Sequence, residues 1–535
     1  MKKIFTLALT ALLATQIQGF ARNQEHQMSV TPEQKMRLVS KYIENYYVDT
    51  VNMDKVSEAA IKGMLKILDP HSTYSNPEET KALNEPLHGN FSGIGITYNM
   101  LNDTLYVLNA VVGGPAEKVG ITTGDRVIMA NDTLIAGQKM TTRDIMGRLR
   151  GPKGTEVRLK VLRKGSPELI EFHLVRDNIP IFSVDAAYMI NPKTGYIRIT
   201  RFSETTAKEF AEAMKKLRKE GLKDLIIDLQ SNGGGYLKPA VEIAEMFLNP
   251  RDMIVYTKGE HTQPYYYVAE KDAPYRDVRV AVMVDPATAS ASEILSGALQ
   301  DNDRGVIVGR RTFGKGLVQR PFPFPDGSMV RLTVSRYYTP SGRCIQKPYD
   351  DGNEAYQDEL NQRYLHGEYS HPDSIAKSTS ERYYTKGRRP VYGGGGITPD
   401  IFVPIDTTAY TKYYRELIAK GLINRFALTY SDDNSKNLKK AYKKENVFLE
   451  KFDVTDKIMK DFVAFAKAEG VEPDEAQLKL SESAIRTIIK AIIGRNLFTQ
   501  DTYYKVANDL NPIYRRTLEL LASPKEYTTI LSGGN

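Results

Sequence analysis

The chain has 535 residues, several times the roughly 100 to 200 residues of one domain, so the sequence predicts two to four domains. Hydrophobic residues make up 41% and charged residues 26%, which excludes a disordered chain, and no stretch after the signal-like start is long and apolar enough for a multi-span membrane protein. The formal net charge of +8 is small and spread along the chain, so nucleic acid is not an expected partner.

The first residues have the pattern of a secretory signal. Two lysines follow Met1, an apolar run extends from Ile4 to Ala14, and small residues precede a cleavage point after Ala21. A short buried helix is the alternative, but it would not begin at the initiator with two lysines. We therefore predict a signal peptide over residues 1–21 and an exported protein of the periplasm or cell envelope, soluble or peripherally associated with the membrane.

Helical periodicity predicts an N-terminal helical region over residues 22–86. Thr31 and Pro32 have the pattern of an N-cap and a first turn, and the segment Asp69–Ser72 is typical of a turn. The apolar stripe of this region consists of Ala59, Ile61, Met64, Leu65 and Leu68.

The pattern then changes twice. Residues 87–177 contain short β-rich runs separated by glycines, which predicts a compact β unit. Over residues 178–404 strand and helix candidates alternate, which predicts an α/β core. Within it, residues 349–392 are polar and tyrosine-rich without clean periodicity, so we interpret them as an insertion or long surface loop.

Residues 405–535 are predicted to form a C-terminal helical domain. Five isoleucines recur there at the spacing of a core-facing helix. They are Ile485, Ile488, Ile489, Ile492 and Ile493.

Metal and histidine chemistry have little support. None of the seven histidines forms a pair at the HExxH spacing, and the single cysteine, Cys344, allows neither a disulfide nor a cysteine-based zinc site. No metal and no organic cofactor is expected. A Ser-His-Asp triad stays open, although no GxSxG elbow exists, and the best histidine, His71, follows Pro70 in a turn, where a structural role is expected.

A glycine-rich segment is a better candidate for a site. Asp228–Gly235 follows an apolar strand and precedes a helix, and its three glycines let backbone amides approach an anion or an oxyanion. An ordinary tight turn explains the segment equally well on its own.

A serine and a lysine complete the candidates. Ser290 lies near a predicted helix start, where the helix dipole favours negative charge, although helix capping alone would also explain it. Lys315 lies between two glycines in an apolar stretch, where burial lowers an ammonium pKa toward that of a general base; a surface lysine is the alternative. Gln319, four residues on, is placed to orient the lysine amine in a local helical or irregular turn.

Together these segments resemble the signature of the carboxyl-terminal processing, or tail-specific, proteases. The resemblance rests on Thr288–Ile294 and Phe313–Gln319, and it is supported by Leu68–Tyr74, Asp228–Gly235, Tyr338–Arg343 and Gly396–Asp400. It implies a multi-domain α/β (α+β) fold: a crotonase-like Ser-Lys protease core with an inserted or preceding PDZ domain and helical regions at both ends.

The resemblance also implies roles. Ser290 would be the nucleophile, Lys315 the general base and Gln319 the residue that positions it. Ser292 and Ser296 are hydroxyl alternatives, disfavoured because the motif aligns on Ser290. The amides that form the oxyanion hole would be those of Ala291 and of a glycine in the pair Gly233 and Gly234.

The unit over 87–177 resembles a PDZ domain. Its carboxylate-binding loop and following strand would comprise Phe91, Gly93, Ile94, Gly95 and Ile96. Arg150 matches the arginine proposed in this family to link PDZ unit and active site. The expected partners are protein or peptide substrates with free, apolar C-termini, and the helical termini are candidate surfaces for a homo-oligomer or an adaptor.

The leading hypothesis is therefore an exported serine endopeptidase that selects substrates by their C-terminal tails. A noncatalytic PDZ scaffold with a protease-like core is the first alternative, and an acyl-CoA enzyme is the second, disfavoured by the PDZ unit and the signal peptide. The chain departs from the family in having Gln230 in place of arginine and Cys344 in place of serine.

Overall fold

The structure is a computed structural model that describes residues 30–101, 103–375 and 381–533. The predicted signal peptide lies outside the described residues. The chain divides into two compact units, Met1–Leu68 and Asp69–Asn535.

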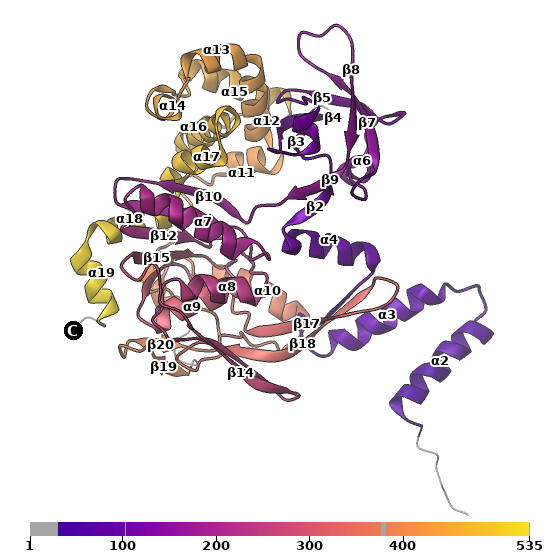
Figure 1. Cartoon of the computed structure of the whole chain (residues 1–535), viewed down its shortest axis with the longest axis vertical. Coiled ribbons are helices and arrows are strands. Elements are labelled where there is room, and N and C mark those ends of the chain that lie inside the picture. Colours follow the sequence, from indigo (N-terminus) through magenta and orange to yellow (C-terminus); the bar gives the residue numbers. More distant parts are fainter. Residues whose placement is uncertain (1–29, 102, 376–380, 534–535) are drawn as a thin grey trace, which may run out of the picture. The chain divides into compact units, whose positions relative to one another are not determined.

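The described part of the first unit consists of two helices, α2 (Pro32–Tyr46) and α3 (Met53–Lys66) (Figure 1). The Thr31 hydroxyl accepts from the Gln34 amide at 3.2 Å, and the Gln34 side chain accepts from the Thr31 amide at 2.9 Å. This capping box confirms the predicted N-cap.

In the second unit, a β-rich segment forms a module of its own. Its elements are β2 (Asn90–Gly93), β3 (Ile96–Leu101), β4 (Thr104–Ala110), α5 (Pro115–Lys118), β5 (Arg126–Ala130), β6 (Thr133–Leu134), α6 (Thr142–Leu149), β7 (Glu156–Leu162), β8 (Ile170–Val175) and β9 (Asp177–Pro180). The main sheet has the order β3-β4-β5-β7-β8, with β6 on β5. Because β2 pairs antiparallel with β9, the chain enters and leaves the module side by side.

The central sheet of the second unit has six strands. They are β10 (Val184–Met189), β11 (Thr194–Ile199), β12 (Asp224–Asp228), β15 (Arg279–Val284), β16 (Gly305–Gly309) and β21 (Ile401–Phe402). All neighbours pair parallel except β10 and β11. The carboxyl ends of β11, β12, β15 and β16 therefore meet at one edge, where ligands bind in open α/β sheets.

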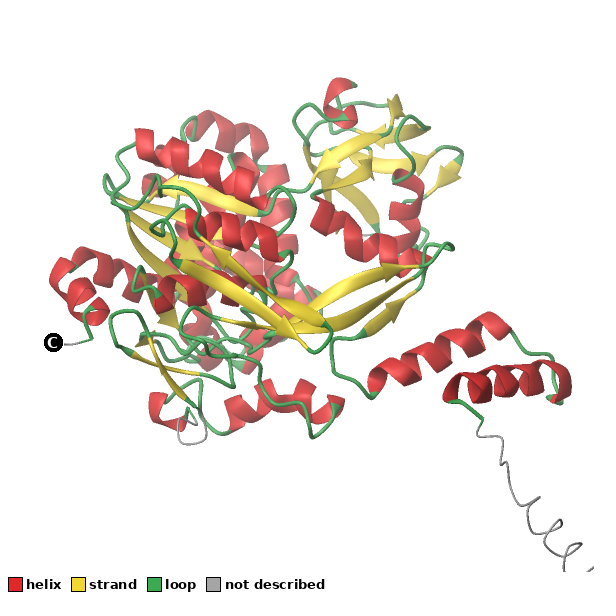
Figure 2. Ribbon diagram, turned by 60° about the horizontal axis from the view of Figure 1, so that its bottom comes forward, coloured by secondary structure: helices red, strands yellow, loops and turns green. Residues whose placement is uncertain are grey.

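Helices cover both faces of this sheet, as Figure 2 shows. Alternate residues of each strand point to opposite faces, so that Ile227 packs with α7, α8 and α9 while Ile226 packs with α18 and α19. The covering helices are α7 (Thr206–Lys219), α8 (Leu237–Glu245), α9 (Ala291–Asp301), α17 (Gln500–Ala507), α18 (Pro512–Ala522) and α19 (Pro524–Leu531). The predicted multi-domain α/β architecture is confirmed, and the last helices of the chain are part of its core.

The same unit contains a second sheet, whose strands are interspersed in the sequence with those of the first. It contains β1 (Thr73–Ser75), β13 (Met253–Gly259), β14 (Thr262–Val268), β17 (Leu317–Pro323) and β18 (Met329–Tyr338), and helix α4 (Pro77–His88) follows β1. Strand β18 pairs with β1, β13 and β17. Residues on β17 and β18 thereby meet the segment that begins at Asp69.

Of the two interpretations of segment 349–392, an insertion or a long surface loop, the loop is wrong, and the insertion stays a prediction. It contains α10 (Asn353–Leu365), the short helix η1 (Pro372–Ser374) and the hairpin β19 (Arg382–Tyr384) to β20 (Pro390–Tyr392). Buried polar groups anchor α10: the Arg363 guanidinium donates to the carbonyls of Thr312 at 2.8 Å and Phe313 at 3.1 Å. Such anchors leave no apolar periodicity in the sequence, which explains the error.

The remaining helices share a hydrophobic core of their own. They are α11 (Lys412–Ala419), α12 (Leu422–Asp433), α13 (Ser435–Ala441), α14 (Glu445–Lys451), α15 (Asp456–Ala468) and α16 (Glu475–Leu497), followed by η2 (Asn508–Leu510) after α17. The predicted isoleucine stripe lies on α16, where Ile485, Ile489, Ile492 and Ile493 are buried and Ile488 is partly buried. Among the described residues, no helix has the length and apolar character needed to cross a bilayer.

Candidate active site

A cavity of about 450 Å³ brings the predicted catalytic residues together. Its walls come from α4, the loop after β12, the start of α9, and strands β17 and β18. Six predicted site residues line it: Gly233, Gly234, Ser290, Ala291, Lys315 and Gln319.

Ser290 occupies the turn between β15 and α9. Its backbone has φ 57° and ψ −117°, a conformation that costs a non-glycine residue free energy and is typical of functional sites. The residue is partly exposed, whereas Ser292 and Ser296 are buried and their hydroxyls donate to the carbonyls of Asn232 and Ser292. Of the three serines, only Ser290 lines the cavity.

The buried carboxylate of Glu293 ties the serine segment to the lysine segment. One oxygen accepts from the amides of Ser290 at 2.8 Å and Lys315 at 2.9 Å, and the other accepts from the Gly314 amide at 2.7 Å and the Thr312 hydroxyl at 2.5 Å. Burial raises the pKa of Glu293 to about 6, and these hydrogen bonds limit the rise. Sequence reasoning missed Glu293, although it lies three residues after the serine, where capping glutamates occur.

Tyr337 on β18 makes a second connection between the two segments. Its buried hydroxyl lies 2.6 Å from the carbonyl oxygen of Lys315 and 3.2 Å from that of Ser290. Ser290 and Lys315 are therefore held together twice, at their amides by Glu293 and at their carbonyls by Tyr337.

The environment of Lys315 favours its neutral amine. Burial lowers the pKa of Lys315 below its ordinary value, and the positive charge of Arg331 lowers it further, against the opposing charges of Glu293 and Asp69. Arg331 lines the same cavity, which places the cation within the site.

Gln319 lies on strand β17, so of the predicted local helical or irregular turn after Lys315 the helical form is wrong. The pairing of β17 with β18 shifts at a β-bulge between Val318 and Gln319. The Gln319 amide nitrogen donates to the Thr333 hydroxyl at 3.1 Å, and that hydroxyl donates to the Asp69 carboxylate at 3.0 Å. The carboxylate of Asp69 can only accept, so the Thr333 hydroxyl donates to it and must itself accept from the Gln319 nitrogen. The carbonyl oxygen of Gln319 is therefore free to accept from another donor.

Asn232 organises the glycine loop. Its side-chain nitrogen donates to the Ile199 carbonyl at 2.8 Å, and its side-chain oxygen accepts from the Gly234 amide at 2.9 Å. The Gly234 amide is therefore already occupied, which leaves Gly233 as the better oxyanion donor of the predicted pair. A Cβ on Gly234 would lie 2.7 Å from Cβ of Ser290, so only glycine fits beside the serine.

His71 does not belong to this site. It is absent from the residues that line the cavity, and its ring lies 2.8 Å from the Tyr356 hydroxyl. Burial lowers the pKa of His71 to about 4, helped by the charges of Lys315 and Lys347 and opposed by that of Asp69, so the ring is neutral near pH 7. A Ser-His-Asp triad with Ser290 has no support from this geometry.

The described residues also offer no metal site, since none of their histidine, cysteine and acidic side chains cluster in threes with the geometry to hold an ion. The expectation of no cofactor stays a prediction.

The predicted carboxylate loop begins in β2 and ends in β3. Ile94 and Ile96 are buried in the core of the β-rich module, and Gly95 has φ 76° between them. Within the described residues, the amides of Ile94 and Gly95 donate to no backbone carbonyl. The loop therefore presents amide donors of the kind that hold a chain-terminal carboxylate.

Arg150 joins this loop to the cavity wall. Its guanidinium carbon lies 4.4 Å from the ring centre of Phe91, and its nitrogen lies 2.7 Å from the Glu85 carboxylate on α4. Leu83 and Leu87 of the same helix line the cavity.

Comparisons with known proteins agree with this geometry. Residues 193–353 match the model of peptidase family S41 and residues 92–174 match that of the PDZ domain. The carboxy-terminal-processing protease of Bartonella bacilliformis is 33% identical over 415 residues, which cover 76% of this chain and 92% of that protein. The chain belongs to the carboxy-terminal processing proteases. It is a peptidase that carries a PDZ domain.

Other relatives of this protease family cover less of the chain. The carboxy-terminal processing protease CtpA of Bacillus subtilis is 33% identical over 65% of this chain and 75% of its own length. Among solved structures, the photosystem II D1 C-terminal processing protease has a TM-score of 0.36 at 26% identity, covering 71% of this chain and 95% of that one. Residues 7–80 match the activating protease CtpB N-terminal domain, and residues 413–499 match a family of unknown function, DUF8443.

The hydrogen bonds of Glu293 predict the effect of Glu293→Gln on this peptidase. An amide group would turn one acceptor oxygen into a donor facing backbone N–H groups, which leaves buried donors unpaired at a cost of about 1–3 kcal/mol. We expect lower thermal stability and a fall in kcat, measured by unfolding and by peptide cleavage. Glu168→Gln, an exposed matched control, should change neither. Full activity and stability of Glu293→Gln would contradict the role of the carboxylate.

Proposed function

We propose that the protein is an exported serine endopeptidase that works with a Ser290–Lys315 dyad and recognises substrates by their C-terminal tails through its PDZ domain. The observation that carries the proposal is the shared cavity of the serine, the lysine and the glycine loop. Export rests on the signal pattern of residues 1–21.

The chemistry begins at the neutral lysine. The Lys315 amine takes the proton of the Ser290 hydroxyl as the hydroxyl oxygen attacks the carbonyl carbon of the scissile peptide bond. The amides of Gly233 and Ala291 donate to the oxyanion that forms. The Lys315 ammonium then gives its proton to the leaving amine, and a water molecule hydrolyses the acyl-enzyme by the same steps in reverse.

Gln319 orients the base. The Gln319 nitrogen donates to Thr333, whose hydroxyl donates to Asp69, so the Gln319 carbonyl oxygen is left as the acceptor for the Lys315 amine during catalysis. The lone pair of that amine is then directed at the serine hydroxyl. A donor at position 319 in place of this acceptor would compete for the lone pair.

The remaining cavity wall favours an apolar substrate residue next to the cut. Aliphatic side chains from four elements surround Ser290, and burying one such substrate side chain is worth about 1.5–3 kcal/mol. These are Leu83, Leu237, Ile294 and Leu317.

The PDZ domain selects the substrate. A free carboxylate binds the amides of the loop at Ile94 and Gly95, and the substrate tail extends along β3. Arg150 lies between this loop and Glu85 of α4, so occupation of the loop bears directly on the helix that walls the cavity.

Replacement of the dyad tests the reaction. We expect Ser290→Ala and Lys315→Ala each to lower kcat/KM on an unfolded substrate with an apolar tail by about a thousandfold or more, with unchanged folding by circular dichroism. Ser57→Ala and Lys193→Ala, two exposed controls, should retain activity. Undiminished cleavage by both dyad variants would favour another catalytic set, and absence of cleavage in the unmodified protein would favour a noncatalytic scaffold.

The pH profile tests the base. Since only the neutral amine of Lys315 can accept a proton, cleavage rises with pH as this group deprotonates. Arg331→Gln removes a nearby positive charge that lowers the pKa of Lys315, so the rising limb of kcat against pH should move to higher pH. Arg320→Gln, at an exposed residue of β17, should leave the limb in place. A shift to lower pH in Arg331→Gln would exclude Lys315 as the base.

Substrates with a modified C-terminus test the proposed recognition by the PDZ domain. A substrate whose terminal carboxylate is amidated should be cut with about tenfold or lower kcat/KM, because a charge-assisted hydrogen bond is lost. A matched substrate with an internal glutamate replaced by glutamine carries the same charge change and should be cut normally. Equal rates for free and amidated tails would remove the carboxylate loop from the proposal.

A further inference from the structure

A second cavity, of about 890 Å³, lies at the carboxyl ends of the parallel strands and shares no lining residue with the catalytic cavity. Arg198 is the last residue but one of β11, Ser231 follows β12, Asp285 follows β15 and Arg310 follows β16. Four adjacent parallel strands thus deliver their ends to one hollow, the position at which α/β sheets bind ligands.

Other lining residues come from the C-terminal helices. Tyr414 and Arg415 lie on α11, Tyr503 and Tyr504 on α17, and Arg515 on α18. Aromatic side chains and guanidinium groups of the C-terminal helices therefore line the same hollow as the strand ends.

The charges that line the cavity do not balance. Arg198 is paired with Asp228, which does not line the cavity, and the other three arginines, Arg310, Arg415 and Arg515, meet two carboxylates, Asp285 and Asp406. Asp285 accepts from the amides of Ser231, Ala287 and Thr288, and Asp406 accepts from the Thr408 amide. Within the part of the chain that the structure describes, neither carboxylate forms an ion pair with an arginine.

Arg310 is the clearest unpaired charge. Its side chain is partly buried, and its one described hydrogen bond goes to the neutral carbonyl of Val403, at 3.2 Å. Burial lowers the pKa of Arg310, although the charge of Asp285 opposes this. Buried charges in proteins are ordinarily paired, whereas this guanidinium forms no ion pair among the described residues, although the Asp285 charge is near enough to act on it.

Arg198 also has spare donor capacity. It pairs with Asp228, and a second nitrogen donates to the Gln230 carbonyl at 3.1 Å. Its Nε atom is buried and has no hydrogen-bond partner among the described residues. An orphaned buried donor of this kind requires an explanation, and a ligand acceptor supplies one.

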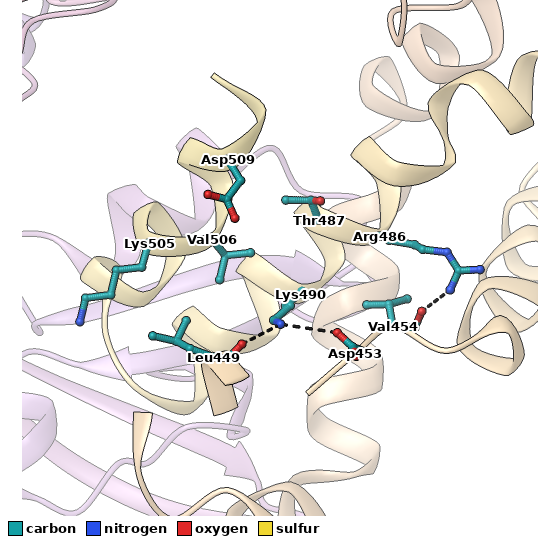
Figure 3. Close-up of a pocket in the computed structure, with 9 residues that line it drawn as sticks. All are labelled: Leu449, Asp453, Val454, Arg486, Thr487, Lys490, Lys505, Val506 and Asp509. Carbon is teal, nitrogen blue, oxygen red and sulfur yellow. Dashed lines mark hydrogen bonds and ion pairs between the residues drawn. The ribbon is translucent and has the colours of Figure 1, made fainter. Parts of the chain in front are cut away.

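Another cavity with cationic side chains differs in the pairing of its charges. The hollow of about 450 Å³ in Figure 3 is also lined by cationic side chains, but each has partners. Lys490 donates to the Leu449 carbonyl at 3.0 Å and lies 3.7 Å from Asp453, while Arg486 binds the Val454 carbonyl and pairs with Asp456.

We propose that the cavity at the strand ends binds a small anionic molecule that carries a phosphate or carboxylate group. Guanidinium groups present paired N–H donors whose geometry matches either group. The volume suits a small ligand, and the tyrosines supply apolar contact for its body. The ligand supplies a direct ion-pair partner for Arg310 and a hydrogen-bond acceptor for Arg198.

Calorimetric titration of the full chain with inorganic pyrophosphate and with citrate, at constant ionic strength, tests this site. We expect saturable binding of at least one probe: pyrophosphate alone would identify a phosphate ligand, citrate alone a carboxylate, and both a site for either group. Binding should persist in Ser290→Ala, because the two cavities share no residue.

Variants decide where the probe binds. Arg310→Gln and, at an exposed position that leaves the fold intact, Arg515→Gln should each weaken binding about tenfold or more, since each removes charge-assisted hydrogen bonds. Arg143→Gln, an exposed control with the same change in charge, should bind normally. Failure of both probes to bind, or equal binding by Arg310→Gln, Arg515→Gln and the unmodified chain, would overturn the proposal without touching the protease assignment.

Discussion

The candidate active site depends on one buried carboxylate. Glu293 gathers three backbone amides and a hydroxyl from the serine and lysine segments, which are otherwise separate in the chain. Since its pKa rises from 4.5 to about 6, the ionised form costs the folded protein about 2 kcal/mol at neutral pH relative to the unfolded chain. The folded state binds more protons than the unfolded state between these values, so this contribution to stability falls as pH rises through that window.

The loop from Asp228 to Gly235 stands between the two cavities. Gly233 and Gly234 line the catalytic cavity, whereas Gln230 and Ser231 line the cavity at the strand ends. Gln230 replaces the usual arginine of the family, and its side-chain oxygen accepts from Asn511 at the start of α18. An arginine has no acceptor to offer Asn511 and would add a further cation to a cavity that already has unpaired ones. The departure is thus consistent with the local charge and with the docking of the C-terminal helices.

Local patterns predicted what depends on local chemistry. Small residues around Ser290 and glycines around Lys315 mark turns after strands, and the isoleucine period of α16 marks a buried helix face. The same patterns gave no sign of the buried charges in segment 349–392, where Arg363 anchors α10 and Arg389 pairs with Asp303 and Asp400. A charged residue is buried only when distant partners compensate it, and those partners are set by the tertiary fold.

The placement of Gln319 shows the same limit within the site itself. The spacing of four residues between Lys315 and Gln319 suggested a local helical or irregular turn, but Gln319 lies on strand β17. The pairing of this strand with β18 contains a β-bulge, and without the extra residue of the bulge the alternation of side chains along the strand would differ. The bulge between Val318 and Gln319 sets which way the amide points, and Thr333 on the partner strand receives it. Asp69, 250 residues away in the chain (319 − 69 = 250), then fixes the direction of the hydrogen bonds. The orientation of the proposed base is therefore decided by strand pairing and by a distant turn, neither of which a short motif contains.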